Sequence, residues 1–205
     1  MIKEQYRLSF DFLRGPLYSF LKNTCLAFCI IFFISLIASL LFPVVLDTLM
    51  SYINAVIQSA DIMNNDGTFS TANILSNNIR ASFLSILYGF LPIIYLPALP
   101  IGLNSSILGA MTASYIGNGQ SMLLLAAGIV PHGIFEFPAL FLSFACGLYL
   151  CHEMTALIRH QENRTPLPET LISLVRVFVL VILPLLLAAS VIEANITPLC
   201  MMPFL

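Results

Sequence analysis

The stretch NTCLAFCIIFFISLIASLLFPVVL, residues 23–46, decides the fold class because it has no charged residue over 24 positions. About 20 apolar residues suffice for a helix to cross the hydrocarbon core of a bilayer. The whole 205-residue chain is similar, with 59% hydrophobic residues, 9% charged residues and a mean hydropathy of +0.96. Because a soluble domain carries roughly 25% charged residues, the composition excludes a soluble enzyme, a nucleic-acid binder and a disordered tail. It predicts an all-α polytopic membrane protein solvated mostly by lipid.

Two amphipathic segments flank this first span. Residues 1–20 carry apolar residues at helical spacing between basic ones and end in a Gly-Pro break, which predicts a short helix on the cytoplasmic membrane surface. Residues 47–76 contain three aspartates and no Lys or Arg, and we expect them to form an extracytoplasmic loop with a helix and a turn at 64–67. The apolar stripe of that helix consists of Leu46, Met50, Ile53, Ile57 and Ala60.

The second charge-free stretch, residues 81–135, is long enough for two crossings. We expect spans at about 79–98 and 102–117, separated by prolines. Residues 121–130 are too short to cross, and Pro-His-Gly follows them at 131–133. The sequence therefore predicts a broken or re-entrant element near 121–135, before a span over 134–151. A cytoplasmic loop at 152–170 and a last span over 171–192, kinked at Pro184, complete about five crossings in a single membrane domain.

The expected span over 102–117 is rich in small residues at helical spacing, which let helix backbones approach closely in lipid. We expect this helix to be central, and its small-residue stripes would also suit a homodimer contact. The candidate helix-packing residues are Gly102, Ser106, Gly109, Ala110 and Ala113.

Basic residues predict the orientation. Of the eight Lys and Arg residues, four precede the first span and three flank the last cytoplasmic loop. Five crossings place these seven inside, with a cytoplasmic N-terminus and an extracytoplasmic C-terminus in a bacterial cytoplasmic membrane. Arg80, at the outer mouth of the second span, is the exception.

Charged groups at bilayer depth cost roughly 2.5–3.5 kcal/mol on insertion scales, so they usually have partners or functions. His132 and Glu136 are four residues apart and share one helix face. Asn77 and Asn78 could cap a helix, Asn104 could bond to a neighbouring helix, and Glu193 could be a solvated end residue. The candidate polar cluster consists of Asn77, Asn78, Arg80, Asn104, His132, Gly133, Glu136 and Glu193.

Three interpretations of this cluster stay open. It forms a buried network that fixes helix packing, with Glu136 paired to Arg80 or His132. Alternatively, it lines a polar cavity that binds an ion, proton or peptide. Finally, His132 and Glu136 act as catalytic groups or as metal ligands, although a zinc site would need at least a third ligand. The five cysteines lack metal-binding spacing, and we expect no cofactor or metal and favour a non-enzymatic protein.

The same residues resemble the stage II sporulation protein M (SpoIIM) family. The resemblance rests on N-N-I-R at 77–80, L-N at 103–104, P-H-G-I-F-E at 131–136 and I-E-A-N-I-T-P at 192–198, and it covers about 70–198. Ser105 stands where the family pattern has Gly, and Phe137 where it usually has Leu. The resemblance implies a small polytopic bacterial membrane protein. The sporulation member anchors cell-wall hydrolases during engulfment, and some relatives are associated with export and maturation of circular bacteriocins.

Three functions follow in order of preference. The first is a SpoIIM-like scaffold for cell-envelope partners, recruited through Met50, Ile53 and Ile57 of the 47–76 segment. The second is a transporter or export component with its site at Arg80, Asn104, His132 and Glu136. The third is an intramembrane hydrolase that uses His132 and Glu136. The expected partners are membrane lipid and extracytoplasmic or membrane proteins, with a homodimer as an option and no nucleic acid.

Overall fold

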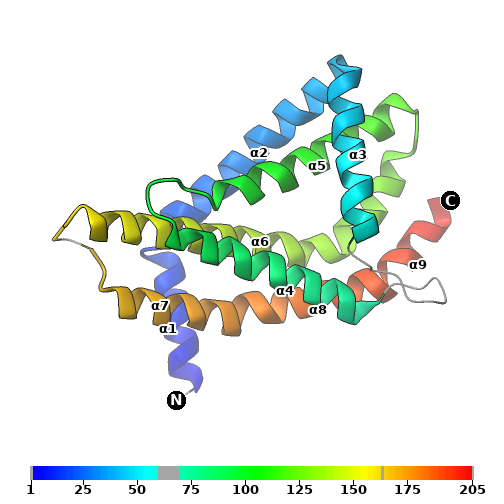
Figure 1. The fold of residues 1–205 in the computed structure, drawn as a ribbon. Helices are drawn as coiled ribbons and strands as arrows, with labels where there is room; N and C mark the ends of the chain where they lie inside the picture. Colours follow the sequence, from blue (N-terminus) through cyan, green and yellow to red (C-terminus); the bar gives the residue numbers. More distant parts are fainter. Residues whose placement is uncertain (1, 60–69, 163, 205) are drawn as a thin grey trace.

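The computed structural model describes residues 2–59, 70–162 and 164–204, and no β-strand occurs in these ranges. Helices α2, α4, α5, α6 and α7–α8 alternate in direction along the long axis of the molecule, while α1 and α3 run across it near opposite ends (Figure 1). The α-helices are α1 (Ile2–Arg14), α2 (Tyr18–Leu41), α3 (Pro43–Ser59), α4 (Thr71–Leu87), α5 (Ala98–Gly117), α6 (Met122–Ile158), α7 (Leu167–Val177), α8 (Leu183–Asn195) and α9 (Thr197–Met201). Shorter elements are the 3-10 turns η1 (Tyr88–Phe90) and η3 (Met202–Phe204) and the π-helical turn η2 (Phe178–Ile182).

Among the described residues, three helical stretches are long and apolar enough to cross a membrane: Tyr18–Leu41, Met122–Ile158 and Leu167–Asn195. The chain is therefore an all-helical protein with membrane-spanning segments. Helices α4 and α5, expected as the second and third crossings, do not belong to this set. Helix α4 has only 17 residues, and α5 contains serine, threonine, asparagine and glycine along much of its length.

Helix α6 corrects the prediction of a broken or re-entrant element near 121–135, because it is continuous for 37 residues with Pro131 and Pro138 inside it. A proline gives no N–H to the carbonyl four residues earlier, which bends a helix without ending it. The bend separates the light green start of α6 from its yellow-green remainder (Figure 1). Helix α6 also continues to Ile158, so the expected cytoplasmic loop at 152–170 is shortened to the residues between α6 and α7.

The last span also changes its helical form near a proline. The π-helical turn η2 lies between α7 and α8 and ends two residues before Pro184, where the sequence predicted a kink. Because Pro184 has no N–H to donate to the preceding turn, the regular hydrogen-bond ladder is interrupted there. The π-helical turn η2 leaves Leu167–Asn195 one continuous helical stretch.

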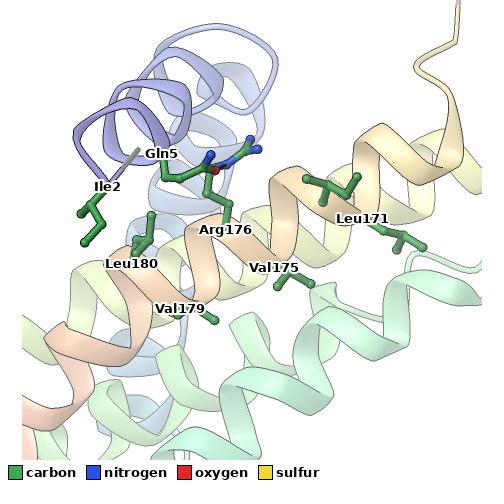
Figure 2. A pocket seen from close by; sticks show the side chains of 8 residues that line it. Ile2, Gln5, Leu171, Val175, Arg176, Val179 and Leu180 are labelled. Carbon is green, nitrogen blue, oxygen red and sulfur yellow. Dashed lines mark hydrogen bonds between the residues drawn. The ribbon is translucent and has the colours of Figure 1, made fainter.

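Helix α1 packs its apolar face against the bundle. Phe12 is buried and its ring meets the Tyr149 ring edge-on, with centroids 5.2 Å apart. Arg176 of α7 donates its Nε–H to Gln5 Oε1 at 2.7 Å (Figure 2). Gln5 and Arg176 also line an open groove of about 510 Å³. Helix α1 is thus anchored by both its apolar face and one charge-assisted hydrogen bond.

The small residues of α5 pack against α2 of the same chain. A Cβ on Gly109 would lie 2.8 Å from the Phe32 carbonyl oxygen and 2.9 Å from the Leu36 nitrogen. Ser35 Oγ donates to the Ser106 carbonyl at 2.9 Å, and Ala110 and Ala113 are buried. Gly102 lies outside this contact, with nothing within 4 Å of a built Cβ. Helix α2 of the same chain thus covers part of these stripes, and the homodimer contact considered above stays a prediction.

The linker between η1 and α5 is held by a hydrogen bond to α6. Ile93 has φ 73°, a left-handed conformation that is strained for a β-branched residue. Its N–H donates to Thr155 Oγ1 at 2.9 Å, and the Thr155 hydroxyl donates to the Cys151 carbonyl at 2.7 Å. Thr155 therefore holds the strained linker in place.

We expect Thr155→Val to destabilise the folded protein by about 1–3 kcal/mol, because it leaves the Ile93 N–H without its acceptor. The measurement is the thermal unfolding midpoint in detergent, followed by circular dichroism. Thr155→Ser keeps the hydroxyl and serves as the matched control. Equal midpoints for the Val and Ser variants would contradict this role for the hydrogen bond.

Candidate functional site

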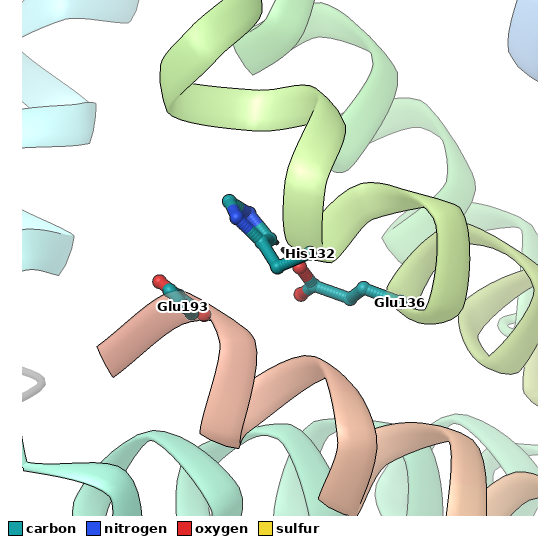
Figure 3. A group of neighbouring side chains, drawn as sticks. All are labelled: His132, Glu136 and Glu193. Atoms are coloured by element: carbon teal, nitrogen blue, oxygen red, sulfur yellow. Dashed lines mark ion pairs between the residues drawn. The ribbon is translucent and has the colours of Figure 1, made fainter. Parts of the chain in front are cut away.

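Two helices bring one histidine and two glutamates together. His132 and Glu136 lie one turn apart on α6, and Glu193 faces them from α8 (Figure 3). One nitrogen or oxygen atom from each side chain lies within 4.8 Å of the other two. His132 Nε2 is 3.5 Å from Glu136 Oε2. We call these three residues the carboxylate–histidine cluster, and no second group of this kind occurs in residues 2–59, 70–162 and 164–204.

Thr197 orients the histidine of this cluster. Its Oγ1 lies 3.2 Å from His132 Nδ1, within hydrogen-bond distance, and the Thr197 side chain is buried. The contact leaves His132 Nε2 directed at Glu136. Thr197 belongs to the I-E-A-N-I-T-P motif at 192–198 but was not predicted as a site residue. Its position four residues after Glu193, at the start of α9, was the available signal.

The two carboxylates lack a Lys or Arg partner among the described residues. Within the described chain, neither Glu136 nor Glu193 forms an ion pair with a Lys or Arg. Arg80 is exposed and lines a separate groove with Phe83 and Phe178, so the predicted pairing of Arg80 with Glu136 is wrong for this structure. Among the residues that the structure describes, His132 is the one cationic partner of these carboxylates, and only in its protonated form.

A pocket of about 490 Å³ lies beside the cluster, between α3, α4, α5 and α6, and we call it the amide pocket. Its walls are mostly apolar, and Glu136 belongs both to the cluster and to the pocket wall. Its other polar residues include Asn77, Asn78, Ser85 and Asn104. The pocket thus joins the candidate residues of α4 and α5 to the carboxylate of α6.

Three expectations for the asparagines need correction. Asn77 and Asn78 do not cap α4, because the helix begins at Thr71 and Ser70 caps it by accepting the Asn73 N–H at 3.3 Å. Asn104 does not bond to a neighbouring helix, because its Nδ2 donates to Pro100 O in its own helix at 2.9 Å. Asn78 Nδ2 is buried and has no hydrogen-bond partner among the described residues.

The surroundings of Gly133 and Glu193 also differ from those expected from the sequence. A Cβ on Gly133 would lie 3.0 Å from the Phe137 ring, so this glycine leaves room for an aromatic side chain of its own helix. Glu193 is half-buried within the cluster rather than a solvated end residue. The fold therefore brings His132, Glu136 and Glu193 together, adds Thr197, and places Arg80 elsewhere.

Comparison with known proteins identifies the family. The family model described as "Stage II sporulation protein M" matches residues 24–198. The chain belongs to the SpoIIM family. The matched range contains every residue of the cluster and of the amide pocket. This SpoIIM-family protein is also 30% identical over 137 residues to the uncharacterized protein MJ0793 of Methanocaldococcus jannaschii, an alignment that covers 63% of this chain and 72% of the relative. No solved structure matches significantly.

Proposed function

We propose that this SpoIIM-family protein is a non-enzymatic membrane scaffold that holds a segment of a partner polypeptide in the amide pocket. The observation that carries the proposal is the buried Asn78 Nδ2, a donor without a partner among the described residues, in a side chain that lines a mostly apolar pocket. Buried donors are nearly always satisfied, so a ligand that accepts this hydrogen bond would stabilise the site.

A polypeptide fits the chemistry of this pocket. A peptide backbone needs both donors and acceptors when it leaves water, because lipid supplies neither. Asparagine side chains provide both, and Asn77, Asn78 and Asn104 line the same pocket. The apolar walls would receive the side chains of the bound segment. Specific polar groups in an apolar concavity are typical of binding sites.

The same proposal gives the chain five crossings, formed by α2, α4, α5, α6 and α7–α8. Their alternating directions (Figure 1) support this arrangement. Arg159 and Arg164 lie between α6 and α7, which favours a cytoplasmic location for that end and an extracytoplasmic C-terminus. Helix α3 runs across the opposite end of the bundle, and its Tyr52 lines the amide pocket. The partner segment would therefore enter the pocket from the extracytoplasmic side.

This location replaces the recruiting surface expected from the apolar stripe of residues 47–76. Ile53 is 6% exposed, and Met50 is half-buried, so neither presents a free apolar face. Ala60 and the predicted turn at 64–67 lie outside the described residues, and so does the side chain of Ile57. An Ile53→Ser substitution would test folding rather than recruitment.

Site-specific photo-crosslinking tests the docking proposal in the cells that produce the protein. A photoreactive amino acid at Leu99, which lines the pocket and is 55% exposed, is expected to form a polypeptide adduct. Adding Asn78→Leu should reduce that adduct about tenfold, because losing one buried hydrogen bond costs about 1–3 kcal/mol. The readout is the adduct's mass and its peptides by mass spectrometry.

The matched control carries the same photoreactive group at Ile134, which is 64% exposed on α6 and lies outside the pocket wall. It should yield lipid adducts or none. The proposal fails if Leu99 and Ile134 give the same polypeptide adducts, or if Asn78→Leu leaves the Leu99 adduct unchanged.

A transport or export role is the second candidate, and the Glu136 carboxylate on the pocket wall favours it. Polar groups at the centre of a membrane bundle mark solute or proton paths in many transporters. Solute or proton flux in proteoliposomes that stops in Glu136→Gln, without any polypeptide adduct at Leu99, would select transport over scaffolding.

A further inference from the structure

We infer that His132, Glu136 and Glu193 form a binding site for one divalent transition-metal ion. His132 and Glu136 alone lack a third ligand for zinc. The fold supplies it, because Glu193 reaches the same point from α8 across 57 residues of sequence. This inference goes beyond the proposed scaffold, and either proposal can fail without the other.

The geometry of the three ligand atoms suits such an ion. At the bond lengths typical of zinc, tetrahedral ligand atoms lie about 3.3–3.5 Å from one another. The His132 Nε2 to Glu136 Oε2 distance is already 3.5 Å. All three ligand atoms lie within 4.8 Å of each other. A small side-chain adjustment of Glu193 therefore completes the set.

The charge of the cluster also favours a cation. Glu136 and Glu193 approach each other without a Lys or Arg in an ion pair with either of them in the described chain. Uncompensated charges at membrane depth are costly. One divalent ion neutralises both carboxylates, whereas a protonated His132 neutralises only one. Mixed imidazole and carboxylate ligands suit zinc, manganese or iron(II) more than calcium or magnesium.

Thr197 provides the support that a ligating histidine requires. Metal-bound imidazoles usually hydrogen-bond through the second ring nitrogen, which fixes the ring orientation. Here His132 Nδ1 lies 3.2 Å from Thr197 Oγ1, and Nε2 is left for the metal. Because Thr197 is buried at the start of α9, the packing of α9 against α6 holds the histidine in position.

Three protein ligands leave a tetrahedral ion one further position. Glu136 belongs to both the cluster and the wall of the amide pocket. The remaining position would therefore be close to whatever occupies that pocket.

Metal analysis of the full-length protein tests this inference. The protein is purified in detergent with an affinity tag free of histidine, incubated with zinc or with manganese, and freed of unbound metal by gel filtration. We expect about one zinc ion per chain by elemental mass spectrometry. Glu193→Gln should lose it, and Thr197→Val should weaken zinc affinity about 10–100-fold in competition with a chelating dye.

Two exposed residues provide matched controls for nonspecific binding. Glu162→Gln removes an exposed carboxylate, and His160→Asn removes an exposed imidazole at φ 52°, a conformation that asparagine tolerates. Both variants should retain the metal content of the wild type. Cobalt binding to the wild-type protein gives a readout that does not depend on any variant, since a tetrahedral site produces visible absorption bands that zinc abolishes.

The inference is overturned if the wild-type protein retains neither zinc nor manganese and shows no cobalt bands, in which case the carboxylates hold protons. It is also overturned if a folded Glu193→Gln variant binds as much zinc as the wild type. Retention in Glu162→Gln and His160→Asn, together with loss in Glu193→Gln, supports it.

Discussion

Replacing Gly147 with valine is expected to remove most of the folded protein from the membrane. A Cβ at Gly147 would overlap the Ser85 carbonyl oxygen and lie 3.0 Å from Pro97 Cβ. From the opposite side, a Cβ at Gly89 would overlap the Gly147 carbonyl oxygen. Backbone atoms cannot rotate away as side chains do, so we expect a loss of about 3 kcal/mol or more, at the upper end for overpacked cores. The measurement is the yield of monodisperse protein in detergent and its thermal midpoint.

Gly102→Ala is the matched control for this prediction. It also adds a Cβ to a helical glycine, but nothing lies within 4 Å of the new atom. Alanine is favoured over glycine in a helix interior by roughly 0.5–1 kcal/mol, so this variant should be as stable as the wild type or more so. If Gly147→Val matched Gly102→Ala in yield and midpoint, the close approach of α4 and α6 would be wrong.

The glycines of α5 and α6 show how much the spacing of small residues in the sequence could predict. Helical spacing placed Gly102 and Gly109 on neighbouring small-residue stripes, but spacing does not tell which part of a stripe meets another helix. Only Gly109 lies against α2. Gly147 continues a series of small residues at the same spacing, Ala139 and Ser143, in another span. This series was not singled out from the sequence, although the backbone contact at Gly147 is among the tightest for the glycines described. Close approach depends on which helices cross and where, which a single sequence does not encode locally.

The candidate site, like the helix contacts, could be predicted only in part from spacing along the sequence. The four-residue spacing of His132 and Glu136 predicted a shared face, and they lie 3.5 Å apart. Glu193 and Thr197 follow the connection between α6 and α7, and only the packing of α8 and α9 on α6 brings them to the site. Arg80 was assigned to the cluster because it is a charged residue at the mouth of an expected span and belongs to the N-N-I-R motif. Its position on α4 places it in another groove.

Pro131 shows why the break near 121–135 was predicted wrongly. A proline at this depth removes one backbone hydrogen bond, which the sequence analysis took as the end of a helix. In a membrane, helix is the conformation that satisfies most remaining backbone groups, so the chain keeps its helix and bends. The bend and the cluster lie side by side on α6, because His132 directly follows Pro131.

Glu193→Gln is expected to change stability in opposite directions with and without zinc. In zinc-depleted protein, the wild type holds two carboxylates within 4.8 Å of each other. Two like charges about 4 Å apart repel by about 1–4 kcal/mol, depending on the local dielectric. Replacing one with a neutral amide should therefore raise the thermal midpoint. In excess zinc the order should reverse, because a ligand at 100 times its Kd stabilises the folded state by about 2.7 kcal/mol.

The measurement is a pair of thermal unfolding curves for each protein, one with chelator and one with zinc. Glu162→Gln removes an exposed carboxylate outside the cluster and should follow the wild type under both conditions. The sign reversal separates a metal site from a packing network. If Glu193 only fixed helix packing, its substitution would lower the midpoint equally with chelator and with zinc. A zinc-induced gain of the same size in wild type and Glu193→Gln would place the ion elsewhere.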